Sequence, residues 1–248
     1  MLYIVIGIGL AFMLLERLIP DQKLHEVKGW WIRVMLINFA QICIIYLGSY
    51  TWDKWFLSYS VFNLSMLHPA IGALIAYFII SFIFYWWHRV RHDVNMLWIL
   101  CHQVHHSARR IETITSFFKH PLEIVLDSML IALVNLVFLG IGVEGSAWTM
   151  LYTACAEYFY HMNIKTPHWL GYIIQRPEMH RIHHMQGKHY KNFADLPVWD
   201  MLFGTYENPL ETKTLCGFKP EREQRFTDML LFKNVNNAYQ SPNKNYEK

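Results

Sequence analysis

Long apolar runs alternate with short polar segments along most of the chain. The runs cover residues 1–15, 30–50, 69–87, 122–142 and 146–160. Apolar runs close to 20 residues long are sufficient to cross the hydrocarbon core of a bilayer as helices. The first run is shorter, but it lacks the basic start and small-residue end of a signal peptide, so we expect a retained membrane helix. The pattern predicts an all-α protein with four to five membrane spans.

The last two apolar runs contain ionisable residues at or near membrane depth. Asp127 lies in the first of them and Glu157 in the second, and a short glycine-containing turn joins the two runs into a predicted helical hairpin. Ionisable groups at membrane depth face the protein interior and have a partner there. We therefore expect each carboxylate to make a satisfied polar contact.

Composition supports a membrane protein. Hydrophobic residues make up 54% of the chain and charged residues only 17%, which is typical of polytopic membrane proteins rather than soluble enzymes. The net charge of +3 gives no reason to expect nucleic-acid binding. The four cysteines are scattered and predicted to be reduced. Cys101 adjoins His102 and is expected to point to another face of the same helix.

The distribution of basic residues predicts the orientation of the chain. The loop around Lys23 and Lys28 is basic, and so is the segment from Arg89 to Lys119, whereas the loop at Lys54 is not. Lysine and arginine accumulate on the cytoplasmic side of membrane proteins. We expect both basic segments and the C-terminus at the cytoplasmic face, in the inner membrane of a bacterium or the endoplasmic reticulum of a eukaryote.

Histidines form three dense clusters outside the apolar runs. They are His88 and His92, then His102, His105 and His106, then His180, His183 and His184. Helical residues three and four apart share a face, so each cluster is expected to point one way. Neutral imidazole suits iron, copper, nickel and zinc, and eight ligands are too many for one tetrahedral zinc. The zinc-protease motif His-Glu-x-x-His is absent. The clusters predict a cap of helices that holds two metal ions beside the membrane.

The motifs around these histidines resemble the fatty acid hydroxylase/sterol desaturase superfamily. The matching segments are Tyr85-Trp-Trp-His-Arg-Val-Arg-His92, His102-Gln-Val-His105-His106-Ser107, His120-Pro-Leu-Glu123, Tyr160-His161-Met-Asn163, His180-Arg-Ile-His183-His184, Asn192-Phe193, Trp199-Asp200 and Phe203-Gly-Thr-Tyr206. Several independent motifs in this order are specific. Departures from the family pattern are Ser81, Ala194 and Phe118-Lys119, which concern surrounding residues and the substrate more than the metal site.

The resemblance implies a metal-ligand set. It comprises His88, His92, His102, His105, His106, His180, His183 and His184, and it adds His161 from the His-x-Asn motif. The family uses nine or ten histidines, so His120 and His189 are candidates for a tenth ligand. The role of His120 stays open, since capping or packing beside Pro121 is at least as plausible. Asn163 is expected either to support a ligand or to shape a turn, and Asp200 to hold its loop.

The resemblance also implies an activity, cofactors and partners. It implies two iron ions, O₂ as co-substrate, and a separate electron donor similar to cytochrome b5, ferredoxin or rubredoxin. The predicted reaction is hydroxylation or desaturation of a lipid, an acyl chain first and a sterol or isoprenoid next. The expected parts are N-terminal spans at 1–68, a catalytic domain at 69–206 and a polar tail at 207–248. The alternative is a histidine-rich metal-binding or metal-transport protein, whose ligands should lie midway along its spans.

Overall fold

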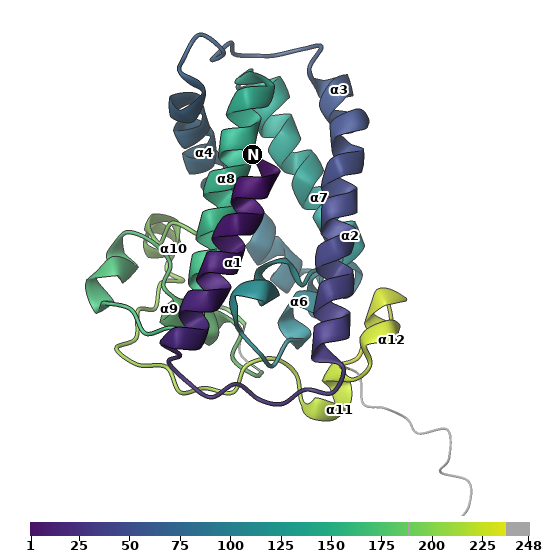
Figure 1. The fold of residues 1–248 in the computed structure, drawn as a ribbon, viewed down its shortest axis with the longest axis vertical. Coiled ribbons are helices and arrows are strands. Elements are labelled where there is room, and N and C mark those ends of the chain that lie inside the picture. The colour runs from purple at the N-terminus through teal and green to yellow at the C-terminus, as the bar shows by residue number, and fades with distance from the viewer. Residues whose placement is uncertain (188, 237–248) are drawn as a thin grey trace, which may run out of the picture.

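The computed structural model describes residues 1–187 and 189–236, and that part of the chain is helical without a β-strand. Five long helices stand side by side (Figure 1). They are α1 (Leu2–Leu18), α2 (Trp30–Tyr50), α4 (Pro69–Asp93), α7 (Pro121–Ala132) and α8 (Gly142–His161). The short helix α3 (Trp52–Phe56) follows α2, and the π-helix η3 (Leu133–Phe138) continues α7. The prediction of an all-α protein is confirmed.

Three stretches are long and apolar enough to cross a membrane. They are Trp30–Phe56, Pro69–Asp93 and Pro121–Phe138. The helices α1 and α8 complete the bundle without meeting the same length and hydropathy requirements, so the expected count of four to five spans is approximate. Large hydrophobic side chains such as Leu36, Phe39 and Phe78 are exposed on the long helices. An extended exposed apolar surface of this kind is suited to contact with lipid.

Prolines and histidines define where two of the long helices begin. Pro69 and Pro121 occupy the first turns of α4 and α7, where a missing N–H costs nothing. The preceding His68 and His120 accept hydrogen bonds from the backbone N–H groups of the first turn. Helix α4 ends at an extended Val94, and the chain turns there instead of continuing away from the bundle.

The remaining helices gather at one end of the bundle (Figure 1). They are α5 (Asn95–Leu97), η1 (Trp98–His102), α6 (Gln103–Ser107), η2 (Thr113–Phe117), η4 (His168–Tyr172), α9 (Pro177–His183), α10 (Val198–Phe203), α11 (Pro220–Glu223) and α12 (Phe226–Leu230). The loop between α3 and α4 lies at the opposite end. Both basic segments and all three histidine clusters therefore lie at the same end of the bundle. This agrees with the prediction, made from the basic residues, that both basic segments lie on one side of the membrane.

The start of the predicted polar tail is packed into the protein. Phe218, Met229 and Val235 are buried in one cluster with Trp30 of α2 and Phe118. The described part of residues 207–236 thus helps to hold the capping helices on the bundle. The rest of the predicted tail, from residue 237 onward, lies outside the described residues.

Candidate metal centre

The nine histidines predicted as ligands converge into two groups. The five-histidine group contains His88, His92, His102, His106 and His183, and the four-histidine group contains His105, His161, His180 and His184. Within each group, one ring nitrogen per histidine lies within 4.8 Å of all the others. Residues nearly 100 positions apart in the sequence therefore meet at one end of the bundle.

The prediction that each sequence cluster points one way is wrong for two of the three clusters. His102 and His106 join the five-histidine group, whereas His105 joins the four-histidine group. In the third cluster, His183 joins the five-histidine group, whereas the histidines on either side of it join the four-histidine group. A helix turns about 100° per residue, so positions four apart differ by only about 40° and adjacent positions diverge. Each His-x-x-His-His motif therefore supplies both groups.

The two groups are direct neighbours. The rings of His106 and His184 stack with their centroids 4.3 Å apart. On the five-histidine side, the Nε2 atoms of His106 and His183 are 3.1 Å apart, and Nδ1 of His183 lies 2.7 Å from the carbonyl oxygen of Lys191. The Nδ1–H of His183 donates to that carbonyl, which leaves a lone pair on Nε2 facing the centre of the group.

The four-histidine group has the same organisation. Nδ1 of His161 lies 2.8 Å from the carbonyl oxygen of Glu157 and donates to it. The Nε2 atom of His180 is 3.0 Å from Nε2 of His161 and 3.0 Å from Nε2 of His184. Nitrogens bound to one metal ion at about 2.1 Å and at right angles are also about 3 Å apart. The spacing fits a shared cation.

Unpartnered nitrogens provide a second test of this fit. His88 donates from Nδ1 to the Phe193 carbonyl at 2.8 Å, and His102 places Nδ1 2.9 Å from the Glu123 carboxylate. The Nε2 atoms of both rings, and that of His92, are buried without a hydrogen-bond partner among the described residues. A buried polar atom left unpaired costs free energy, and a metal ion would supply the missing partner.

The electrostatic environment keeps these imidazoles neutral. Burial lowers the pKa of His183 to about 3, against a smaller opposing effect of its hydrogen bond to Lys191. Burial, followed by neighbouring positive charge or imidazoles, also lowers the pKa values of His102, His105, His106, His180 and His184 well below the usual value. Neutral imidazole is the form that coordinates metals. The groups are therefore ready to bind cations at neutral pH.

The two candidates for a tenth ligand have different surroundings. The ring of His189 lies 4.7 Å from that of His106, and its Nδ1 is 3.2 Å from the His183 carbonyl oxygen. His120 instead accepts from the Leu122 N–H at 3.0 Å and packs against Phe232, with ring centroids 4.8 Å apart. His189 thus borders the five-histidine group, while His120 caps α7.

Other residues singled out in the sequence have structural contacts. Asp200 accepts hydrogen bonds from the backbone N–H groups of Phe193 and Ala194 at 2.8 and 3.0 Å, so it holds its loop as expected. The Asn163 side chain donates to the Gln22 carbonyl and accepts from the Gln22 N–H, so it ties the segment after α8 to the loop after α1. Cys101 is buried but belongs to neither histidine group.

A small cavity of about 50 Å³ opens beside both groups. His88 and His102 of the five-histidine group line it, together with His105, His161 and His180 of the four-histidine group. Its remaining walls combine apolar side chains, such as Ile80, Ile131 and Phe193, with the charged side chains of Arg91, Lys119, Glu123, Glu157 and Asp195. A small reactant in this cavity would face histidines of both groups.

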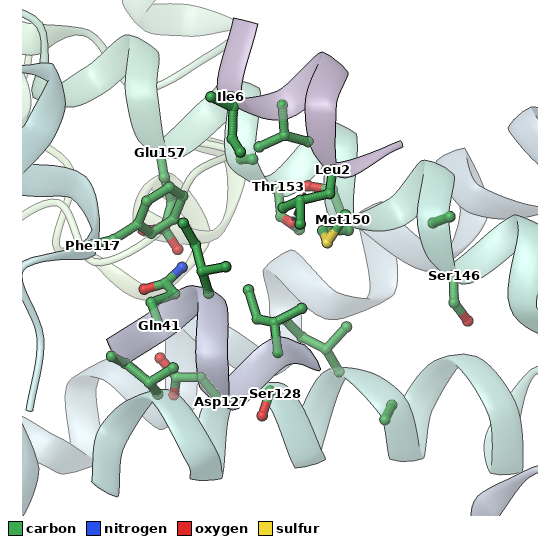
Figure 2. Close-up of a pocket in the computed structure, with 18 of the residues that line it drawn as sticks. Leu2, Ile6, Gln41, Phe117, Asp127, Ser128, Ser146, Met150, Thr153 and Glu157 are labelled. Atoms are coloured by element: carbon green, nitrogen blue, oxygen red, sulfur yellow. Dashed lines mark hydrogen bonds between the residues drawn. The ribbon is translucent and has the colours of Figure 1, made fainter. Parts of the chain in front are cut away.

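A much larger groove of about 540 Å³ runs between α1, α2, α7 and α8 and is mainly apolar (Figure 2). Glu157, Gln41 and Asp127 gather near one end of it, and Ser146 lies toward the other. Five residues line both the groove and the small cavity: Phe84, Lys119, Ile131, Thr153 and Glu157. The two spaces therefore adjoin at this wall.

The sequence did not reveal the pairing at this junction. Lys119 stood out only as one of several basic residues near the membrane, and Glu157 only as a carboxylate that needed a partner. In the structure the Lys119 ammonium group is 2.9 Å from both oxygens of Glu157. Asp127, the other expected polar contact, accepts a 2.7 Å hydrogen bond from the Trp87 indole. Lys119 and Glu157 are 38 residues apart, so no local sequence pattern predicts that they are in contact.

Comparison with known proteins identifies the class to which this fold and site belong. Residues 73–205 match the sequence profile of the fatty acid hydroxylase family, which covers more than half of the chain. The chain belongs to the fatty acid hydroxylase family, as its motifs predicted. The matched region contains all nine predicted ligands.

Several curated proteins are similar to the chain at modest identity. Human alkylglycerol monooxygenase is 30% identical over 164 residues, which are 64% of this chain and 34% of the relative. The zebrafish (Danio rerio) alkylglycerol monooxygenase is 29% identical over 54% of this chain and 30% of its own length. Ornithine lipid hydroxylase OlsE of Rhizobium tropici is 28% identical over 68% of this chain and 48% of its own length. The chain thus spans less than half of each of these relatives, and no solved structure matches it.

Proposed function

We propose that this protein is a membrane-embedded, O₂-dependent oxidoreductase that hydroxylates or desaturates a lipid. The observation that carries the proposal is the convergence of nine neutral imidazoles into two adjacent groups beside a cavity that adjoins an apolar groove. Membership of the fatty acid hydroxylase family supports it. By name, two relatives act on alkylglycerol and one on ornithine lipid, which favours a lipid substrate here as well.

The two histidine groups would each hold one iron ion. Iron supplies the reduction of O₂ and the removal of hydrogen from a C–H bond, chemistry that no side chain performs. The protein contributes the geometry of the ligands. Glu123 fixes the ring of His102, and the Phe193 carbonyl fixes that of His88. Such outer hydrogen bonds orient metal-binding histidines and set their tautomers.

The bundle would deliver the substrate from the bilayer. The groove between α1, α2, α7 and α8 is lined mainly by aliphatic side chains, so an acyl, sterol or isoprenoid chain would bury its apolar surface there. The reacting carbon would then reach the small cavity beside the histidines. The spans of residues 1–68 would form part of this groove, and residues 69–206 would supply the ligands.

The membrane orientation and the electron supply are parts of the same proposal. The basic segments lie at the histidine end of the bundle, so this end would face the cytoplasm. Electrons would come from a separate cytochrome b5-, ferredoxin- or rubredoxin-like donor on that side. Placement of the histidines at the ends of the long helices, as with His88 and His92 on α4, disfavours the metal-transport alternative.

The proposal is tested with protein purified without oxygen. We expect about two iron ions per chain, and consumption of O₂ that requires both a chemical reductant and a lipid extract. Mass spectrometry should then detect lipids that have gained one oxygen atom or lost two hydrogen atoms. Lipid profiles of cells with and without the gene should identify the natural substrate.

A bound but catalytically inert metal would contradict the proposal. Iron at two ions per chain with no oxidised lipid from any extract would favour the metal-binding alternative. The control is a His25→Ala variant, which removes a histidine that belongs to neither group. This variant should retain both iron and O₂ consumption.

A further inference from the structure

A buried ion pair stands at the boundary between the apolar groove and the histidine-lined cavity. Lys119 and Glu157 line both spaces, and the Lys119 ammonium group is 2.9 Å from each Glu157 carboxylate oxygen. Phe84, Ile131 and Thr153 complete the shared wall. Any molecule that reaches from the groove toward the histidines therefore passes this pair of charges.

The ion pair is not sealed off from these spaces. The side chain of Lys119 retains 13% of its accessible surface and that of Glu157 retains 17%, although both lie within the bundle. By contrast, Arg176 and Glu178 form a buried ion pair in which each side chain retains only 1% of its accessible surface. Since the residual surface of Lys119 and Glu157 lies where the two spaces adjoin, their polar atoms are available to a bound molecule.

The charged groups around the junction include more carboxylates than cations. Lys119 also lies 3.8 Å from Asp127, and Arg91 lies 3.6 Å from Asp127 and forms an ion pair with Glu123. Asp195 also lines the small cavity. At their usual charges, these groups and Glu157 are two cations and four carboxylates. The junction has no excess of positive charge for an anion such as a free carboxylate or phosphate. A neutral group with an oxygen atom fits it better, because it can accept from Lys119 or donate to Glu157.

The size of the small cavity limits how a lipid enters it. Its volume of about 50 Å³ is far below the 540 Å³ of the groove. One water molecule needs about 10–15 Å³ on this scale, so the small cavity has room for only a few non-hydrogen atoms. Only one end of a long lipid can therefore face the histidines while the rest lies in the groove.

We propose, building on the proposed oxidation of lipids, that Lys119 and Glu157 bind a neutral oxygen-containing group at the leading end of the substrate. Suitable groups are a hydroxyl, an ether or the carbonyl of an ester or amide. The hydrocarbon tail extends from this group along the groove, away from Glu157 and toward Ser146 (Figure 2). The oxidised carbon then lies within a few bonds of the polar group, not at a distant methyl end.

Binding to the metal-free protein tests this proposal independently of catalysis. We would measure displacement of a pyrene-labelled C16 alcohol from protein in lipid nanodiscs by 1-hexadecanol, hexadecane and palmitate. A hydrogen bond to a charged group corresponds to a preference of about tenfold or more. The wild-type protein should prefer the alcohol over both competitors by about that factor.

Three variants separate recognition from structure. The double variant Lys119→Met with Glu157→Leu removes both charges without leaving a buried carboxylate unpaired, and it should bind alcohol and alkane about equally well. Lys119→Arg keeps the cation and should retain the preference for the alcohol. Lys165→Met removes an exposed lysine that pairs with Glu211 far from the groove, and it should also retain the preference.

The possible outcomes are distinct. A wild-type protein that binds hexadecane or palmitate as tightly as the alcohol would overturn the proposal. So would an undiminished preference in the double variant, provided thermal unfolding shows that the variant is folded. Selective alcohol binding without any lipid oxidation would support this recognition site and contradict the proposed function instead.

Discussion

The two histidine groups differ in how firmly the surrounding protein holds their rings. In the five-histidine group, His88, His102 and His183 each engage Nδ1 with a carbonyl or carboxylate oxygen at 2.7 to 2.9 Å. In the four-histidine group, His161 has such a bond, to the Glu157 carbonyl. In the described part of the chain, the Nδ1 atoms of His105, His180 and His184 are buried without a partner, as is Nδ1 of His106 in the five-histidine group.

The difference suggests separate roles for protein and metal in shaping the site. Outer hydrogen bonds fix ring orientation before a metal arrives. The fold therefore preorganises three of the five rings in the first group and one of the four in the second, so the geometry of the four-histidine group would depend more on a bound ion. Variants of single residues can test whether the two groups respond as differently as these contacts imply.

The largest effect is expected from His105→Ala. This change removes one of the four proposed ligands in the less preorganised group, so iron should fall toward one ion per chain and lipid oxidation should drop to background. The loss of metal affinity should exceed the roughly 10–100-fold typical of an outer hydrogen bond. Metal analysis and O₂ consumption measure these effects, and the variant should still insert into the membrane.

The matched change His106→Ala sharpens the comparison. It removes one of five ligands from the preorganised group, so a smaller loss of iron is expected than for His105→Ala. Full activity in His105→Ala would exclude that residue as a ligand. Equal losses in the two variants would contradict the proposed difference between the groups.

A smaller effect is expected from Glu123→Gln. The Glu123 carboxylate contacts His102 and forms an ion pair with Arg91, so the amide would weaken the orientation of one ring in the five-histidine group. We expect metal affinity to fall by about 10–100-fold at that group while the other remains occupied. Iron titration measures both affinities. Equal weakening at the two groups would show that Glu123 acts on the fold as a whole.

Asp200→Asn should act mainly on stability. Asp200 accepts from the Phe193 and Ala194 N–H groups and from the Thr205 hydroxyl at 2.7 to 3.0 Å. Replacing one carboxylate oxygen by an NH₂ group removes an acceptor from this buried network, at a cost of about 1–3 kcal/mol. Thermal unfolding measures the change. Since the Phe193 carbonyl orients His88, iron affinity at the five-histidine group should decrease slightly.

The smallest effect is expected from His120→Ala. The variant loses the cap on the first turn of α7, which is worth about 1 kcal/mol, and it should keep both metal ions. Unfolding experiments and iron analysis test both statements. His189→Ala is the informative counterpart, because His189 borders the five-histidine group. A loss of iron in His120→Ala would mean that the cap also serves the metal centre.

Local sequence patterns predicted much of the fold because hydrophobicity and helix starts are local properties. The apolar run at residues 30–50 corresponds to α2, and Pro69 begins α4 as expected. The convergence of the clustered histidines was predictable for a similar reason, since imidazoles at this density along a chain are typical of metal binding. Family membership, predicted from motif order, is confirmed.

What the sequence could not predict depends on contacts between distant segments. Helical periodicity places His105 and His106 on different faces, but it does not say which partners each face meets. The π-helix η1 adds a wide turn immediately before these residues, and its rotation has no signature in the spacing. The contact between Lys119 and Glu157 likewise arises only when η2 packs against α8.

Each His-x-x-His-His motif contributes residues to both histidine groups, and this has a consequence for how two metal ions would bind. His105 and His106 are joined by one peptide bond yet serve different groups, and His183 and His184 repeat this arrangement. Because these residues are adjacent in the chain, the backbone limits how far apart the two histidine groups can lie. An ion that immobilises α6 and α9 at one position also restricts the neighbouring rings at the other. Loading should therefore be cooperative, with the first ion lowering the entropic cost of the second.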